Sequence, residues 1–371
     1  MGIEPKSATR LFRKASKLGI PLHGVFELTP MCNMNCRMCY VRKSPEEVQR
    51  EGGLIPAEKW YDMAVQAREE GMLFLLFTGG EPFLYPDFFP LYEKIDALGF
   101  MTAINSNGTM LDEETVKWLS GHAPYRMQIT LYGGSSATYE RLCKNPRGFD
   151  QVIRAFDLLK KYHIFFKINA TMTPANIGDL EEIYRIAKEY NVYVQATPYM
   201  FPPVRRDETL AGGGFRFSPE EAGRYLAEID RLRFDRETLK ERISILKQAE
   251  KQREELDDDG GCGRDVFEPL GCRAGRSSFW LNWKGQMTAC GMMNTPCAYP
   301  FRDGLRTAWD QIREYTARAY LPAKCSLCKN RSACVVCGAA VYCENGSINN
   351  EPPGYVCRMT ESYVGCLEHF R

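Results

Sequence analysis

Three closely spaced cysteines carry the clearest chemical signal in this sequence. Cys32, Cys36 and Cys39 are separated by three and then two residues, directly after an apolar segment. This spacing lets one loop supply three thiolates to three corners of a cubane iron–sulfur cluster, so the fourth iron stays open to another ligand. A zinc site and a set of buried thiols are the alternative interpretations.

Two further polar motifs follow apolar segments later in the chain. Thr78 is followed by Gly79, Gly80, Glu81 and Pro82. A Gly-Gly pair after a strand is by itself more often a tight turn than a ligand site, and no Gly-Lys-Ser/Thr follows to make it a phosphate loop. The second motif, at residues 105–108, reads Asn-Ser-Asn-Gly. The two motifs therefore indicate a ligand site only in combination with the cysteine loop.

The elements that must position these motifs alternate between short apolar runs and helical patterns. Strands are predicted at residues 24–29, 72–78, 100–105, 126–131, 164–171 and 192–197. Helices are predicted between them at residues 56–70, 86–98, 112–120, 149–162 and 177–190. Repeated β-α units indicate an α/β fold, a parallel sheet closed partly or fully as a (β/α)6 barrel. The motifs then lie on loops at the carboxyl ends of the strands, where such folds carry their chemistry.

Together, the cysteine loop and the Gly-Gly-Glu-Pro motif resemble the radical S-adenosylmethionine (SAM) superfamily over about residues 22–200. The resemblance implies that SAM chelates the open iron of a [4Fe-4S] cluster through its amino and carboxylate groups. Reductive cleavage of SAM then yields a 5′-deoxyadenosyl radical. One departure is Met38, which stands where relatives often have an aromatic residue. The implied SAM-binding residues are Met38, Tyr40, Gly79, Gly80, Glu81, Pro82, Ser106, Asn107, Thr130 and Arg141.

The C-terminal part of the chain is rich in cysteine. Eleven of the fifteen cysteines lie between Cys262 and Cys366, many in Cys-x2-Cys pairs, which suits metal ligation better than a disulfide framework. The pattern resembles the SPASM domain, a carrier of auxiliary clusters, and so implies two further [4Fe-4S] clusters. The implied ligands are Cys262, Cys272, Cys290 and Cys337 for the first cluster, and Cys325, Cys328, Cys334 and Cys357 for the second.

Some of these cysteines have alternatives. A zinc ribbon also uses paired Cys-x2-Cys units, so zinc is the main competing interpretation for this region. Cys143, on an expected helix, is interpreted as a small buried apolar residue. Cys297, Cys343 and Cys366 are left without a role and could replace a ligand or act as a donor.

Composition limits the partners and the compartment. Forty-eight basic and 47 acidic residues leave a formal charge of +1, which gives no electrostatic reason to expect a nucleic-acid partner. No apolar run is long enough for a membrane span, and the basic start lacks the apolar core of a secretory signal. We therefore expect a cytoplasmic protein whose basic start forms a surface helix.

Four consecutive parts are expected. They are an N-terminal extension (residues 1–22), the barrel (23–200), a linker loop with two helices at 219–234 and 236–256 (201–258), and the cysteine-rich SPASM domain (259–371).

The resemblance implies an enzyme, in particular a maturase that modifies a ribosomally made peptide or a protein. One expected partner is an electron donor such as flavodoxin or ferredoxin. Because only about 23 residues precede the first strand, leader recognition is expected to need either a separate leader-binding protein or the surfaces of the barrel and the SPASM domain. The alternatives are formylglycine formation in a sulfatase, radical chemistry on a non-peptide small molecule, and a non-catalytic iron–sulfur or zinc protein. Sulfatase-maturing relatives carry an Asp base where this chain has Gly291, which favours peptide maturation.

Overall fold

The computed structural model describes residues 6–205, 215–258, 272–348 and 351–370. The chain divides into two compact units that are discontinuous in sequence. The barrel unit comprises Met1–Ala170, Arg185–Gln195 and Arg273–Ala317. The cysteine-rich unit comprises Thr171–Tyr184, Ala196–Cys272 and Arg318–Arg371.

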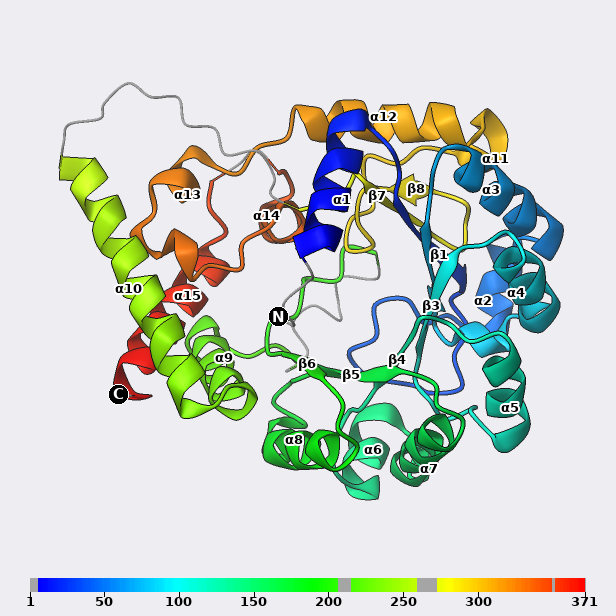
Figure 1. Cartoon of the computed structure of the whole chain (residues 1–371), viewed down its shortest axis with the longest axis horizontal. Helices are drawn as coiled ribbons and strands as arrows, with labels where there is room; N and C mark the ends of the chain where they lie inside the picture. The colour runs from blue at the N-terminus through cyan, green and yellow to red at the C-terminus, as the bar shows by residue number, and fades with distance from the viewer. Residues whose placement is uncertain (1–5, 206–214, 259–271, 349–350, 371) are drawn as a thin grey trace. The chain divides into compact units, whose positions relative to one another are not determined.

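A mostly parallel sheet organises the barrel unit (Figure 1). The strand order is β6-β5-β4-β3-β2-β1-β7-β8, so each of the six predicted strands lies beside its neighbour in sequence. This confirms the α/β fold with consecutive β-α units. The strands are β1 (His23–Thr29), β2 (Phe74–Gly79), β3 (Met101–Ser106), β4 (Arg126–Thr130), β5 (Phe166–Thr171) and β6 (Val194–Thr197), with β7 (Ser278–Leu281) and β8 (Met287–Thr288) added.

The two added strands were not anticipated from the sequence. β7 pairs with β1 in parallel, with His23 opposite Ser278 and Phe26 opposite Leu281, and β8 pairs with β7 in antiparallel fashion. A segment from late in the chain therefore extends the sheet on the side of the first strand.

Helices pack on the outer face of the strands (Figure 1). Phe26 of β1 contacts Trp60, with ring centroids 5.0 Å apart, and Phe166 of β5 stacks on Phe156 at 4.8 Å. Because side chains alternate along a strand, the residues next to Phe26 in β1 and next to Phe166 in β5 face the inside of the barrel. The helices of this region are α2 (Pro45–Arg50), α3 (Ala57–Glu69), α4 (Phe88–Asp96), α5 (Glu113–Gly121), α6 (Ser136–Cys143), α7 (Gly148–Lys161), α8 (Leu180–Glu189), α11 (Pro300–Asp303) and α12 (Leu305–Ala317).

The first helix, α1 (Lys6–Leu18), is amphipathic and contributes to the core. Phe12 and Ala15 are 8% and 3% exposed, and they pack with Leu22. Phe12 also stacks on Phe74 of β2 with centroids 5.6 Å apart. The helix expected at the basic start is therefore present, with its apolar stripe covered and with Arg10, Arg13, Lys14 and Lys17 exposed.

The cysteine-rich unit is helical in its described part. Its helices are α9 (Pro219–Arg233), α10 (Arg236–Asp258), α13 (Ala323–Leu327), α14 (Gly338–Asn345) and α15 (Gly354–Leu367). Ala227, Leu239 and Ile243 form a core cluster with Tyr363 and Leu367, so α9 and α10 bury the apolar faces that their sequences predict. Buried Asp230 accepts hydrogen bonds from Tyr363 Oη (2.5 Å) and Arg242 Nε (3.1 Å), which link the three long helices.

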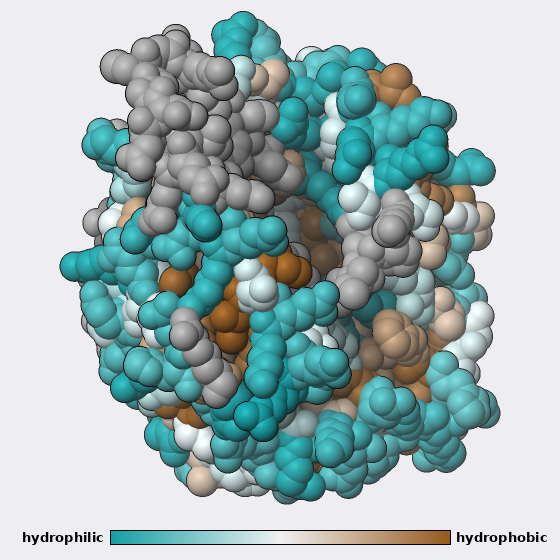
Figure 2. Space-filling view, turned by 60° about the vertical axis from the view of Figure 1, so that its left-hand side comes forward, coloured by the Kyte–Doolittle hydropathy of each residue, from teal (hydrophilic) through white to brown (hydrophobic). Residues whose placement is uncertain are grey.

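The surface seen in Figure 2 is mainly hydrophilic, with hydrophobic residues exposed in separate areas. Among the described residues, no helix is both long enough and apolar enough to cross a membrane.

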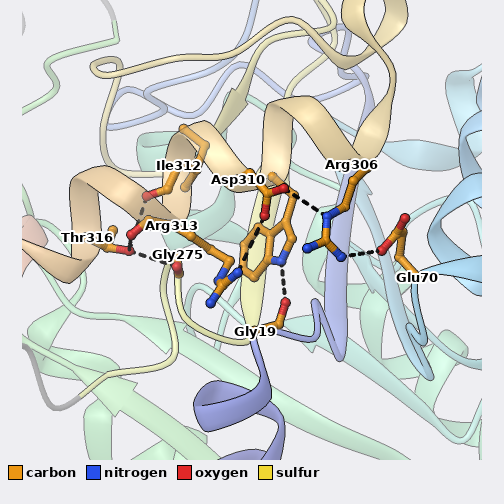
Figure 3. Close-up of polar contacts among 9 residues, drawn as sticks. Gly19, Glu70, Gly275, Arg306, Asp310, Ile312, Arg313 and Thr316 are labelled. Atoms are coloured by element: carbon orange, nitrogen blue, oxygen red, sulfur yellow. Dashed lines mark hydrogen bonds and ion pairs between the residues drawn. The ribbon is translucent and has the colours of Figure 1, made fainter.

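Helix α12 fastens two loops of the barrel unit through buried hydrogen bonds (Figure 3). Trp309 is fully buried and donates from Nε1 to the carbonyl oxygen of Gly19 at 2.7 Å. Thr316 donates to the carbonyl oxygen of Gly275 at 2.7 Å. On the exposed side, Arg306 pairs with Glu70 and Asp310. The polar contacts of α12 thus include buried hydrogen bonds and exposed ion pairs. These two kinds of contact contribute different amounts to the free energy of unfolding.

Replacing Trp309 by Phe should lower the free energy of unfolding by about 1–3 kcal/mol, because it leaves the Gly19 carbonyl buried without its donor. Replacing Arg306 by Ala, the control, should cost less than about 1 kcal/mol because both of its ion pairs are exposed. Urea unfolding followed by circular dichroism compares the two. Equal losses would contradict this assignment.

Candidate functional site

The cysteine loop begins where β1 ends, and its sulfurs accept hydrogen bonds from the loop's own backbone. The amide of Met34 donates to Cys32 Sγ at 3.4 Å, and the amide of Arg42 donates to Cys39 Sγ at 3.3 Å. Hydrogen bonds to sulfur stabilise thiolates, the form in which cysteine binds a metal. Burial nevertheless raises the pKa of Cys32 to about 12, so the Met34 amide offsets only part of the cost of a thiolate at this position.

Cys36 has two further side-chain partners that the sequence did not indicate. Hydrogen bonds from the Cys143 thiol and, secondarily, the Tyr132 hydroxyl lower the pKa of the Cys36 thiol, although burial opposes them. Cys143 is fully buried, as expected, at the end of α6. Backbone hydrogen bonds join the same two segments, the cysteine loop and the end of α6. The amides of Asn35 and Arg37 donate to the carbonyls of Cys143 and Leu142, each at 3.0 Å.

The Gly-Gly-Glu motif packs directly against the start of this loop. The amide of Gly80 donates to the Thr29 carbonyl at 2.7 Å, and the amide of Glu81 donates to the Met31 carbonyl at 2.9 Å. A Cβ on Gly79 would lie 2.3 Å from the Thr29 oxygen, and one on Gly80 would lie 2.3 Å from the Met31 oxygen. Both glycines are therefore required by the close approach of two backbones.

Glu81 is a fully buried carboxylate at the centre of this arrangement. Its Oε1 accepts from Ser106 Oγ at 2.9 Å, and its Oε2 accepts from the amide of Asn107 at 2.8 Å. Burial raises the pKa of Glu81 to about 7, although these hydrogen bonds act against the shift. No ion pair involves Glu81 in the described part of the chain. A buried carboxylate without a cation suits a ligand that brings a positive charge, such as an ammonium group.

Asn107 links the end of β3 to the cysteine loop. Its Nδ2 donates to Asn33 Oδ1 at 2.9 Å and approaches Cys32 Sγ at 3.6 Å. Its Oδ1 accepts from the amide of Thr109 at 2.9 Å, and Asn33 Nδ2 donates to Thr109 Oγ1 at 2.8 Å. Four predicted residues, Cys32, Glu81, Ser106 and Asn107, thus form one hydrogen-bonded group to which Asn33 and Thr109 also belong.

The other predicted SAM-binding residues lie near the same strand ends. Thr130 ends β4, and Pro82 begins the turn after Glu81. Met38 and Tyr40 lie on either side of Cys39 and are half-buried. Arg141 is an exposed residue of α6 whose Nη2 donates to Thr138 Oγ1 at 3.2 Å. Their roles toward SAM stay predictions.

A second group of thiols lines a cavity of about 210 Å³ within the cysteine-rich unit. Its walls include the four residues predicted for one auxiliary cluster, Cys325, Cys328, Cys334 and Cys357. Burial, followed by the charges of the Cys357 and Cys334 thiols, raises the pKa of Cys325 to about 11. Cys334 Sγ accepts from the amide of Val336 at 3.4 Å. This donor set suits a group that binds thiolates.

The remaining predicted ligands are divided between the units. Cys337 caps α14, where its Sγ accepts from the amide of Ala340 at 3.4 Å. Its pKa is raised by burial, and the neighbouring Cys272 thiol contributes in the same direction. Cys290 belongs to the barrel unit. Cys262 lies outside the described residues.

The described residues contain no three His, Cys, Asp or Glu side chains that converge on the position of a single metal ion. Cluster ligands need not converge in this way, because each thiolate binds a different iron of the cubane. The cysteines in the described ranges are free thiols.

Polar residues on the inner face of the strands were not identified from the sequence. Glu27 of β1 is 1% exposed and accepts a hydrogen bond from Trp280 Nε1 of β7 at 3.0 Å. Gln128 of β4 and Lys167 of β5 are each 8% exposed and lie opposite each other in the sheet. A polar residue at every second position of an otherwise apolar strand is the signal that could have found them.

Comparison with known proteins agrees with this geometry. The family model of the radical SAM superfamily matches residues 26–187. The AdoMet-dependent heme synthase of Methanosarcina barkeri is 23% identical over 90% of this chain and 95% of that protein. The subtilosin biosynthesis protein AlbA of Bacillus subtilis is 25% identical over 46% of this chain and 37% of that protein.

Solved structures show the same fold. Streptococcus suis SuiB bound to its precursor peptide SuiA superposes with a TM-score of 0.62 at 19% identity, covering 93% of this chain and 79% of SuiB.

Replacing Gly80 by Ala should displace the cysteine loop, because the new Cβ would meet the Met31 carbonyl at 2.3 Å. We expect the reconstituted variant to lose about four irons relative to the wild type, one cubane cluster. Gly178→Ala is the matched control, since nothing lies within 4 Å of its added Cβ. Iron content per chain is the measurement, and full iron loading of the Gly80 variant would contradict the packing argument.

Proposed function

This chain belongs to the radical SAM superfamily, and on that premise we propose that the group around Cys32 and Glu81 holds a [4Fe-4S] cluster and SAM side by side. Cys32, Cys36 and Cys39 would ligate three irons, and Glu81 would receive the ammonium group of SAM. The observation that carries this proposal is the chain of hydrogen bonds from Glu81 through Asn107 to Cys32. When bound, the cluster and SAM supply a 5′-deoxyadenosyl radical for hydrogen abstraction.

The protein's own part is to fix the geometry of this site. Ser106 and the amide of Asn107 hold the two carboxylate oxygens of Glu81 in place, at 2.9 and 2.8 Å. Burial of Glu81 excludes water from its surroundings, so its attraction for an ammonium group is stronger than in solvent. The contact of Gly80 with the cysteine loop keeps that carboxylate beside the thiolates. These constraints favour one orientation of the bound ligand.

For the cysteine-rich unit, we propose two auxiliary [4Fe-4S] clusters. Cys325, Cys328, Cys334 and Cys357 would hold one, which is supported by their shared cavity. Cys262, Cys272, Cys290 and Cys337 would hold the other, which is supported by the effect of the Cys272 thiol on the pKa of Cys337. Such clusters would pass electrons or ligate the substrate. An electron donor such as flavodoxin or ferredoxin would serve all three clusters.

The substrate that we propose is a peptide or protein side chain. AlbA acts in the biosynthesis of a bacteriocin, and SuiB was solved with a precursor peptide bound. Similarity to both supports a maturase of ribosomally made peptides.

Formylglycine formation ranks lower for a steric reason. A base at position 291 would need a side chain, but a Cβ on Gly291 would lie 2.5 Å from the ring of Trp280. That ring is held by its hydrogen bond to Glu27. The surroundings of Gly291 therefore oppose a carboxylate at this position, in agreement with the ranking from sequence.

Chemistry on a non-peptide molecule is the second candidate. The heme synthase of Methanosarcina barkeri aligns with this chain from end to end, whereas AlbA aligns with less than half of it. A tetrapyrrole substrate therefore has specific support.

Anaerobically reconstituted protein should contain about twelve irons and should form 5′-deoxyadenosine from SAM under reduction. Replacing Cys32, Cys36 and Cys39 together by Ala should abolish that product and leave about eight irons in the other clusters. Iron analysis and chromatography provide both readouts. About four irons with stoichiometric zinc would reject the auxiliary clusters, and residual product in the variant would reject the site.

The substrate class can be tested in one set of anaerobic reactions. A candidate precursor peptide, a sulfatase-motif peptide and an iron porphyrin precursor of heme are offered separately, with mass spectrometry as the readout. We expect a mass change in the precursor peptide. Heme formation alone would establish the second candidate, and formylglycine alone would overturn the steric argument at Gly291.

A further inference from the structure

The inner face of β4 and β5 brings basic side chains together. Phe166 stacks on Phe156 of α7, so Lys167, the next residue, faces the opposite side, into the barrel. Gln128 lies opposite Lys167 in the sheet and shares its face. Arg126, two residues before Gln128, lies on that face too. Residues from two neighbouring strands therefore place a Lys and an Arg on one inner surface.

Lys167 is buried without a carboxylate partner. It is 8% exposed, and its Nζ donates to Gln195 Oε1 at 2.5 Å. Burial, followed by the positive charge of Arg126, lowers the pKa of Lys167 to about 8. No ion pair within 4.0 Å joins Lys167 or Arg126 to an acidic residue in the described ranges. The neutral amide of Gln195 offsets only part of the cost of burying this charge.

Part of the guanidinium group of Arg126 makes no hydrogen bond to the described residues. Its Nη2 donates to Tyr125 Oη at 3.2 Å, but its buried Nε has no hydrogen-bond partner among the described residues. Arg126 and Arg273 both act on His23 at the start of β1. Burial, then the charges of Arg273 and Arg126, lower the pKa of His23 to about 4. The positive potential therefore extends across several strands of the barrel.

Glu27, the acidic residue on the inner face of β1, does not neutralise these cations. Its carboxylate accepts from Trp280 and forms no ion pair with Lys167 or Arg126. Buried charges in proteins are normally paired, because an unpaired one costs several kcal/mol of solvation. Such a cost persists at a functional site when a ligand provides the missing charge.

We propose that the inner face of β4 and β5 binds a carboxylate group of the substrate between Lys167 and Arg126. This inference rests on the proposed function, because it assumes a substrate inside the barrel. The carboxylate would belong to an acidic side chain or C-terminus of a peptide, or to a propionate of a porphyrin. In both cases it would anchor one end of the substrate near the amino ends of β4 and β5, and the rest of the molecule would extend toward the carboxyl ends of the strands, where Glu81 lies.

The test measures binding with the full-length reconstituted protein, without SAM and without a reductant. One arm compares a short peptide containing a single Glu with the same peptide containing Gln, and the other compares hemin with its dimethyl ester. Isothermal titration calorimetry gives the affinities. We expect the acid to bind at least tenfold more tightly than its neutral analogue in one arm, and that arm identifies the source of the carboxylate.

Lys167→Met should abolish the preference for the acid, whereas Lys167→Arg should retain it. No tenfold preference in either arm, or a preference that survives Lys167→Met, overturns the proposal. Because the titrations contain no SAM, their result does not depend on whether the protein cleaves SAM. Failure of the carboxylate site is therefore distinguishable from failure of the proposed function.

Thermal stability supplies a second readout that needs no probe. Lys167→Met should raise the melting temperature, since it removes a buried charge that has no carboxylate partner. Arg216→Met is the matched control, because Arg216 is also largely buried but pairs with Glu344. That variant should lower the melting temperature by leaving Glu344 unpaired. A decrease for both variants contradicts the assignment of Lys167 as an unpaired cation.

Discussion

The backbone of Gly80 lies so close to the start of the cysteine loop that one added methyl group would push the two segments apart. The rest of the site depends on this contact. A Cβ on Gly80 would lie 2.3 Å from the Met31 oxygen. The contact joins the end of β1 to the end of β2 at the point where one carries thiols and the other carries Glu81. Proximity of these groups is therefore a consequence of strand pairing.

The surroundings of Glu81 explain how the protein tolerates its buried charge. Hydrogen bonds from Ser106 and Asn107 stabilise the carboxylate, yet burial still raises its pKa to about 7. A cationic ligand would compensate this cost. Inside the barrel, Lys167 presents the opposite case, a buried cation that forms no ion pair with any acidic residue in the described part of the chain. Glu81 thus places a buried negative group at the carboxyl ends of the strands, and Lys167 and Arg126 place positive groups near the amino ends of β5 and β4.

Much of this arrangement was predictable from sequence. The six strands follow from apolar runs, and the cysteine loop and Glu81 follow from motifs placed after those strands. The contact of Cys143 with Cys36 was not predictable, because the two residues are far apart in sequence and meet only when α6 packs against the loop. β7 was missed because its four residues lie outside the predicted β-α repeat, which identified the equally short β6. The alternation of Lys167 with Phe166 and Ile168 places it on one face of β5, but the sequence does not say which face is the inner one.

The most direct test of the account is electron–nuclear double resonance on the reduced protein with SAM labelled with ¹⁵N in its amino group. If the thiols of the cysteine loop and Glu81 form one site, the labelled nitrogen should show a hyperfine coupling to the cluster. The triple variant of Cys32, Cys36 and Cys39 should lose that coupling while the signals of the auxiliary clusters remain. A wild-type spectrum without nitrogen coupling, recorded with saturating SAM, would contradict the account.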